Sequence, residues 1–113
     1  MMINLRTLAL ILMVLSLSTL SQSVIAEEKF AIAADGPQPM ALIVKLAGVA
    51  PYFHLYDIDG NQLEVLANPH LDMEFGTGPA AATTLADMGV TVLVARRLPG
   101  PKMHDVMKER NIR

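Results

Sequence analysis

The apolar residues of this chain fall into short runs separated by glycine, proline and polar turns, which predicts a succession of strands and helices. The run KFAIAA, residues 29–34, precedes Asp35-Gly36-Pro37 and predicts a buried first strand followed by a turn. Residues 52–58 (YFHLYDI) and 62–67 (QLEVLA) lie on either side of Asp59-Gly60-Asn61, a tight-turn signal. Together they predict a β-hairpin.

Two stretches with glycine–proline starts predict helices. An Ala-rich stretch begins at Pro79, with Gly78 as the expected N-cap and Gly89 as the C-terminal stop. A second helix is predicted over residues 103–110, after Pro99-Gly100-Pro101.

The stretch VTVLVA, residues 90–95, lies between these helices and predicts a strand that is apolar throughout, as expected where helices cover both faces of a sheet. Residues 39–50 fit a strand or a helix equally well. The predicted order is therefore strand, undetermined element, hairpin, helix, strand and helix, an α/β domain with a mixed sheet.

The first 26 residues have the pattern of a secretory signal peptide. Arg6 precedes a long aliphatic run, and a small, polar stretch ends at Ala26. The apolar run of residues 8–20 is shorter than the roughly 20 residues that span a bilayer. We therefore expect cleavage after Ala26, a periplasmic or secreted location, no stable membrane insertion afterwards, and one domain over residues 27–113.

The composition of the expected mature domain excludes several classes of function. Removing 26 of the 113 residues leaves 87, with 8 Lys and Arg against 11 Asp and Glu. This acidic balance gives no electrostatic basis for binding nucleic acid. The absence of cysteine excludes disulfides and thiolate ligands. No pairing of a nucleophile with a base, zinc-ligand spacing or phosphate-loop motif is present, so we expect no enzyme activity.

The starts of the two predicted helices are the candidate binding site. The first N–H groups of a helix have no intrahelical partner, and the helix dipole adds partial positive charge, so such ends accept anions. The second start follows a strand directly and lies among most of the basic residues of the domain. The alternative is that the glycines only cap helices and the arginines are solvated. The candidate binding residues are Gly76, Thr77, Gly78, Ala80, Arg96, Arg97, Gly100 and Lys102.

Five segments in order resemble the dinitrogenase iron–molybdenum cofactor biosynthesis family. They are Lys29–Gly36, the Gly48-Val49-Ala50-Pro51-Tyr52-Phe53 segment, Gly76–Ala82, the Leu85-Ala86-Asp87-Met88-Gly89-Val90 segment, and Gly100-Pro101-Lys102. The resemblance covers nearly all of residues 29–113. It implies a three-layer α/β fold with a ribonuclease-H-like arrangement and no hydrolytic site. It also implies a carrier, scaffold or storage role for anionic iron–sulfur, iron–molybdenum or other molybdenum-containing clusters.

Two positions depart from the pattern of this family. Leu46-Ala47-Gly48-Val49 stands where the family often has His-Phe-Gly-Arg, and Phe75 stands where many members have histidine. Binding of an anion by backbone N–H groups does not depend on these side chains. The absence of the family's histidines and arginine from these positions equally suits a cofactor-free protein-interaction module that keeps the fold.

The remaining candidate ligands are histidine and methionine. His70 lies in a loop with Asp72, Met73 and Glu74 and is a candidate metal ligand. His54 and His104 are expected to be structural. The methionines of the domain could suggest Cu(I), but Met88, Met103 and Met107 fall at helical spacing and predict core packing.

The sequence thus gives two hypotheses. The first is an exported, non-catalytic carrier of an anionic cluster, with an apo-metalloprotein acceptor or a second copy as partner; the second is the cofactor-free interaction module. Only Asn111-Ile112-Arg113 follow the last predicted helix, so the last strand of the family fold is expected to be missing. We expect either an exposed sheet edge that pairs with a partner or a less stable monomer.

Overall fold

The computed structural model describes residues 27–113, and the predicted signal peptide lies outside the described residues. Four strands form one mixed sheet in the order β3-β2-β1-β4. β1 (Lys29–Ala34), β2 (Tyr52–Asp57) and β3 (Gln62–Ala67) are antiparallel neighbours, whereas β4 (Val92–Val94) runs parallel to β1 on its other side. The predicted first strand, the hairpin and the fourth strand are therefore confirmed, although β4 is shorter than its apolar run.

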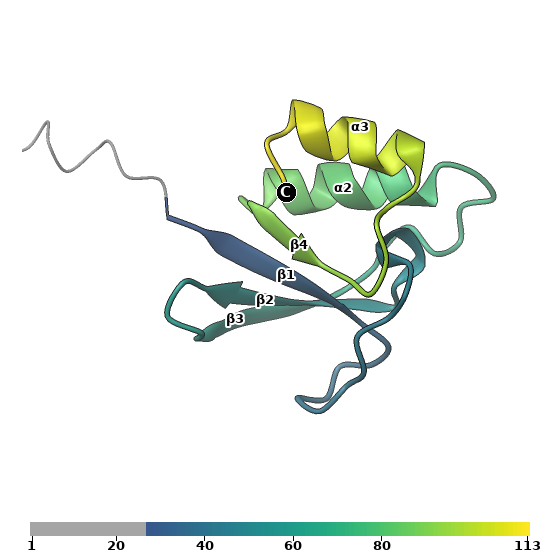
Figure 1. Ribbon diagram of the computed structural model, residues 1–113. Helices are drawn as coiled ribbons and strands as arrows, with labels where there is room; N and C mark the ends of the chain where they lie inside the picture. Colours follow the sequence, from purple (N-terminus) through teal and green to yellow (C-terminus); the bar gives the residue numbers. More distant parts are fainter. Residues whose placement is uncertain (1–26) are drawn as a thin grey trace, which may run out of the picture.

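Both helices, α2 (Thr77–Asp87) and α3 (Pro101–Glu109), lie on one face of the sheet (Figure 1). Their buried side chains join those of the central strands in a single core. This core includes Ala31, Ala33, Phe53, Leu55, Ala81, Ala82, Leu85, Met103 and Met107. The α/β class with a mixed sheet is confirmed, and Met103 and Met107 pack in the core as expected.

The described residues form two layers, sheet and helices, rather than the three that the resemblance implies. The apolar β4 led us to expect helices over both faces. The structure instead places Val92 and Val94 beside Phe30 and Ile32 on the face without helices, where all four side chains are half-buried. Part of this face is lined by the segment after β1, whose Ile43 bridges Ala34.

The undetermined stretch 39–50 is mostly loop and ends in a single 3₁₀ turn, η1 (Ala47–Val49). Gly48 and Pro51 limit regular structure here, so neither a full strand nor a helix forms. The predicted N-cap Gly78 is wrong: α2 begins two residues earlier, with Gly76 as its N-cap. Proline is tolerated anywhere in the first turn, where its missing N–H costs nothing, so Pro79 does not fix the boundary.

The two helices end in the same way and return the chain to the sheet. After α2, Gly89 has a φ of +83°, and the N–H of Val90 donates to the carbonyl of Leu85. After α3, Asn111 has a φ of +59°, and the N–H of Ile112 donates to the carbonyl of Met107. The backbone after each helix end then pairs with the sheet: β4 follows α2, and Arg113 follows α3.

Asp57 holds the turn of the hairpin. Its carboxylate accepts hydrogen bonds from the backbone N–H groups of Asp59 (3.0 Å) and Asn61 (2.9 Å) and from the Asn61 side chain (3.1 Å). The bonds from Asn61 lower the pKa of Asp57 below its ordinary value of 3.8. The turn is therefore stabilised by the ionised form.

We expect Asp57→Ala to lower the melting temperature at neutral pH, because the carboxylate and its hydrogen bonds are removed. A lowered pKa gives stability that is complete above the unfolded-state pKa of about 3.9 and is lost as the pH falls through the folded-state value. The difference in melting temperature between wild type and variant should consequently shrink in acid. Asp59→Ala, which removes another acidic side chain from the same turn, is the control; an Asp57→Ala difference that is independent of pH would contradict the prediction.

The part of the chain that the structure describes contains no helix with the length and apolarity needed to cross a membrane.

Candidate functional site

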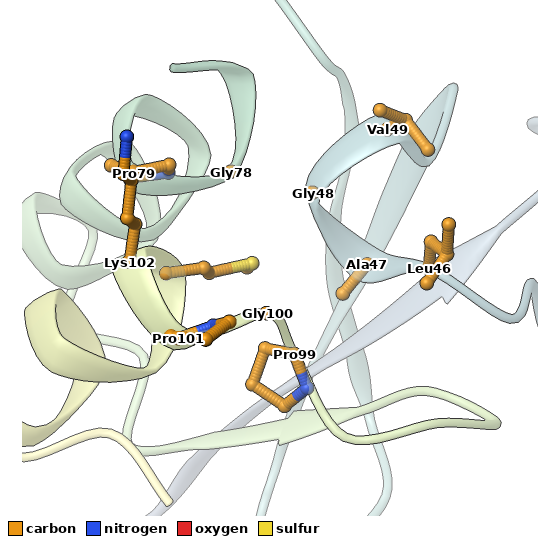
Figure 2. Close-up of a pocket in the computed structure, with 11 residues that line it drawn as sticks. Leu46, Ala47, Gly48, Val49, Gly78, Pro79, Pro99, Gly100, Pro101 and Lys102 are labelled. Carbon is orange, nitrogen blue, oxygen red and sulfur yellow. The ribbon is translucent and has the colours of Figure 1, made fainter.

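One pocket is bounded by η1 and by the first turns of both helices (Figure 2). Its volume is about 490 Å³. Figure 2 shows Leu46 and Val49 on the wall that η1 forms and Pro79, Pro101 and Lys102 on the opposite wall. The two helix starts that the sequence marked as an anion cradle therefore share one cavity, together with a third wall that sequence reasoning did not assign to the site.

The prolines determine which backbone donors each helix start can offer. In α2 the N–H of Ala80 already donates to the carbonyl of Gly76, and Pro79 has no N–H, which leaves Thr77 and Gly78 as first-turn donors. In α3 the N–H of His104 donates to Gly100, and Pro101 has none. The donors there are Lys102 and Met103. Neither N-cap makes a side-chain capping bond, so the helix starts keep this capacity.

The pocket combines this polarised backbone with an apolar lining. Lys102 is the one charged residue among the described residues that line it, and most of the others are aliphatic, proline or glycine. A small hydrated ion would lose water against such walls without gaining enough partners. The lining suits a larger anion with weakly hydrated outer atoms, which can contact carbon on one side and N–H groups on another.

The width of the pocket depends on a close contact between two glycines. A Cβ atom added at Gly48 would lie 2.7 Å from the Cα of Gly78, and one added at Gly78 would lie 3.2 Å from the Cβ of Met103. The backbone of η1 therefore touches the start of α2, which in turn touches α3. The approach at 2.7 Å to a backbone atom requires glycine at Gly48, whereas a side chain at Gly78 would have to displace Met103 by a few tenths of an ångström.

Asn68 fastens the η1 wall to the end of β3. Its side-chain amide donates to the carbonyls of Ala50 (2.9 Å) and Gly48 (3.3 Å), and its side-chain oxygen accepts from the N–H of His70 (3.0 Å). The residue is only 6% exposed. A buried amide that satisfies several backbone groups holds a loop in one position. Sequence reasoning missed Asn68 because nothing in the chain distinguishes it from an ordinary loop asparagine.

The structure separates the predicted site residues into two groups. Gly78, Gly100 and Lys102 line the pocket, while Gly76, Thr77 and Ala80 belong to the start of α2 without lining it. Arg96 and Arg97 line a different groove, at the edge of β4. The prediction that these arginines share the cradle came from their position in the sequence. The backbone N–H groups of Arg96 and Arg97 instead donate to the carbonyls of Val44 and Lys45. These bonds hold the two arginines beside the loop that precedes η1.

The side chains of His54 and His70 form hydrogen bonds within the protein. The Nε2 of His54 donates to the carbonyl of Gly36 (2.8 Å), and its Nδ1 accepts from Gln62 (3.4 Å). His54 is buried and fills a structural role, as expected. The Nε2 of His70 lies 2.7 Å from the Oγ1 of Thr84 in a hydrogen bond. Within residues 27–113 no group of three or more His, Asp or Glu side chains could hold a metal ion, so the metal site at His70 remains a prediction without further ligands.

A family model described as dinitrogenase iron–molybdenum cofactor matches residues 28–113. The chain belongs to this family. The match extends over the whole described domain, including both helix starts and η1, so the sequence resemblance is confirmed. Membership associates the chain with the iron–molybdenum cofactor or a related cluster, in the manner of a cofactor-binding or carrier accessory domain. A search of curated proteins gives no match.

Solved structures with the same fold support this assignment. The apo form of the orange protein from Desulfovibrio gigas has 28% sequence identity and a TM-score of 0.69, and the alignment covers 75% of this chain and 71% of that one. A NifB-type protein from Thermotoga, determined by NMR, has 29% identity and a TM-score of 0.62, covering 75% and 72%. The protein PH0822 shares the fold at 22% identity and a TM-score of 0.59, covering 74% and 73%.

Proposed function

We propose that this protein is an exported, non-catalytic accessory domain that binds an anionic metal–sulfur or molybdenum-containing cluster in the pocket between η1, α2 and α3. The observation that carries the proposal is the convergence of both helix starts on one apolar cavity. Family membership supplies the class of cargo. The orange protein, a likeness at 28% identity, supports a cofactor-associated role.

The residues of the pocket suit a preassembled cluster better than a bare metal ion. The first-turn N–H groups of Gly78, Lys102 and Met103, together with the Lys102 side chain, offer hydrogen bonds and positive charge to the outer atoms of an anion. Direct ligation needs several His, Asp, Glu or thiolate groups, and the described residues do not bring such a set together. The cargo would therefore keep its own ligands and be recognised through its surface.

Uptake of tetrathiomolybdate, a sulfur-coated anion, tests this proposal. The full chain is expressed and purified from the compartment in which it accumulates; its intact mass identifies the N-terminus, which is Glu27 if the predicted signal peptide is removed. Metal analysis and visible absorption are measured before and after incubation with tetrathiomolybdate and desalting. We expect about one bound molybdenum per chain and a shifted absorption band. Molybdate, an oxygen-coated dianion of the same charge, should not be retained by the apolar walls.

A metal-free protein that retains neither anion would contradict the carrier proposal and favour the second candidate, a cofactor-free interaction module. A specific observation supports that candidate. Leu46 and Val49 are exposed at the wall of the pocket, and Phe75, close before α2, is 81% exposed. Exposed apolar side chains that lie together, as Leu46 and Val49 do at this wall, are typical of protein-binding surfaces. This candidate predicts a stable protein partner in a pull-down from the same compartment and no chromophore.

A further inference from the structure

The segments that follow β1 and β4 leave the sheet at the same end, because these two strands are parallel neighbours. Figure 1 shows both segments there, away from the turn of the β2–β3 hairpin at the opposite end. Two backbone bonds join them: the N–H of Arg96 donates to the carbonyl of Val44 (3.0 Å), and that of the next residue donates to Lys45 (3.1 Å). Residues 40–45 and 96–98 therefore form one surface, which we call the strand-end surface.

The strand-end surface presents three large apolar side chains to solvent. Met40 is 89% exposed, Leu42 is 72% exposed and Leu98 is 89% exposed. The loop that carries the first two is closed at its base by Asp35. The N–H of Asp35 donates to the carbonyl of Leu42 (3.0 Å), and its carboxylate accepts from the N–H of Leu42 (2.9 Å). Because these bonds already order the loop, its apolar side chains can bind a partner at a reduced entropic cost.

The strand-end surface is also basic. None of the 11 Asp and Glu residues of the chain falls within residues 36–56 or 88–104, although these stretches hold four Lys and Arg residues, three of them on the strand-end surface. Lys45, Arg96 and Arg97 are exposed, and in the part of the chain that the structure describes none of them forms an ion pair. The acidic domain therefore has one basic end, which attracts a negatively charged partner.

Exposed apolar side chains beside unpaired cations fit the surface of an anionic lipid bilayer. Lys and Arg side chains bind at the level of the lipid phosphates, while apolar side chains enter the boundary between headgroups and acyl chains. Met40 and Leu98 protrude as separate tips. A fluid bilayer accepts such tips wherever they lie, whereas a protein partner needs a fitted recess for each anchor.

We propose that the strand-end surface binds anionic phospholipid bilayers reversibly, with its three apolar side chains below the headgroups and its three basic side chains at the lipid phosphates. The surface adjoins the cluster pocket, because Leu46 and Pro99, which line that pocket, directly follow its two segments. Membrane binding places the mouth of the pocket close to the bilayer. It requires no bound cluster, so the proposal is tested separately from the carrier function.

Vesicle flotation with the purified, metal-free protein tests the proposal. We expect binding to vesicles of equal parts phosphatidylglycerol and phosphatidylcholine, little binding to phosphatidylcholine alone, and release at high salt, because salt screens exposed charges. Lys45→Glu should weaken the binding about tenfold. Lys108→Glu is the matched control, since it makes the same charge reversal at an exposed position in the last turn of α3, and it should change the binding at most about twofold.

A second pair of variants tests the apolar contact. Met40→Ser/Leu42→Ser should weaken vesicle binding at least about tenfold. Ile58→Ser/Leu63→Ser removes two exposed apolar side chains from the hairpin and should leave binding nearly unchanged. The chain contains no tryptophan, so Met40→Trp adds a single reporter, whose emission should shift to the blue when the anionic vesicles are added. Ile58→Trp, with its reporter at the other end of the sheet, should show no shift.

Circular dichroism and melting temperatures close to those of wild type establish that each variant folds. Absence of binding to the phosphatidylglycerol vesicles overturns the proposal, and so does binding that the strand-end variants weaken no more than their controls. An acidic protein that wild type captures and Lys45→Glu loses, in the absence of vesicle binding, also overturns it and assigns the surface to a protein partner.

Discussion

Replacing Gly48 by valine should unfold the wall of the pocket and cost more stability than any exposed substitution in the domain. Even the first carbon of the new side chain would lie 2.7 Å from the Cα and 3.3 Å from the N of Gly78. These are backbone atoms of a helix that packs on α3, so they cannot turn away as a flexible side chain could. Overpacking of this kind costs about 1–3 kcal/mol, and valine adds two methyl groups to the clash.

Chemical denaturation measures this effect as a lower midpoint, and tetrathiomolybdate uptake measures its consequence for the pocket. Gly100→Ala is the matched control, since it also changes a glycine that lines the pocket, but nothing lies within 4 Å of the added carbon. We expect the control to lose up to about 1 kcal/mol, because alanine is a poorer N-cap than glycine, and therefore less than Gly48→Val loses. Equal midpoints for Gly48→Val and wild type would mean that η1 does not rest on α2 in solution.

The sequence predicted most of the local structure, because local signals determine it. The hairpin followed from the Asp-Gly-Asn turn between two β-rich runs, and the bonds of the Asp57 carboxylate explain why that turn forms. The stops of both helices lie where glycine or asparagine can adopt a positive φ. The exact start of α2 was missed, because two glycines two residues apart, Gly76 and Gly78, are both suitable N-caps.

The sequence predicted two of the three walls of the pocket, the starts of α2 and α3, but not the wall that η1 forms. The glycine–proline starts of α2 and α3 carry a local signature, and their meeting in one pocket follows from the packing of two helices on the same face of the sheet. The third wall, η1, has no such signature, and its role depends on contacts between residues far apart in the chain, such as Gly48 with Gly78. Arg96 and Arg97 adjoin α3 in sequence, yet they line a different groove, at the edge of β4.

The second prediction with a large effect concerns Lys102, at which stability and binding should change in opposite directions. Lys102 is exposed in the first turn of α3, where the helix dipole disfavours its positive charge. Lys102→Glu places a carboxylate there, which the same dipole favours. The variant should therefore unfold at an equal or slightly higher denaturant concentration than wild type.

The same substitution replaces a positive charge at the pocket by a negative one and should weaken tetrathiomolybdate binding about tenfold, which corresponds to about 1.4 kcal/mol. Lys108→Glu is the control: it makes the same charge reversal in the last turn of α3, where it should slightly lower stability and leave binding nearly unchanged. Titration by visible absorption, combined with denaturation of both variants, separates the two effects. Because a general loss of structure would lower stability and affinity together, weaker binding by a protein that is at least as stable as wild type attributes the loss to the charge at the start of α3.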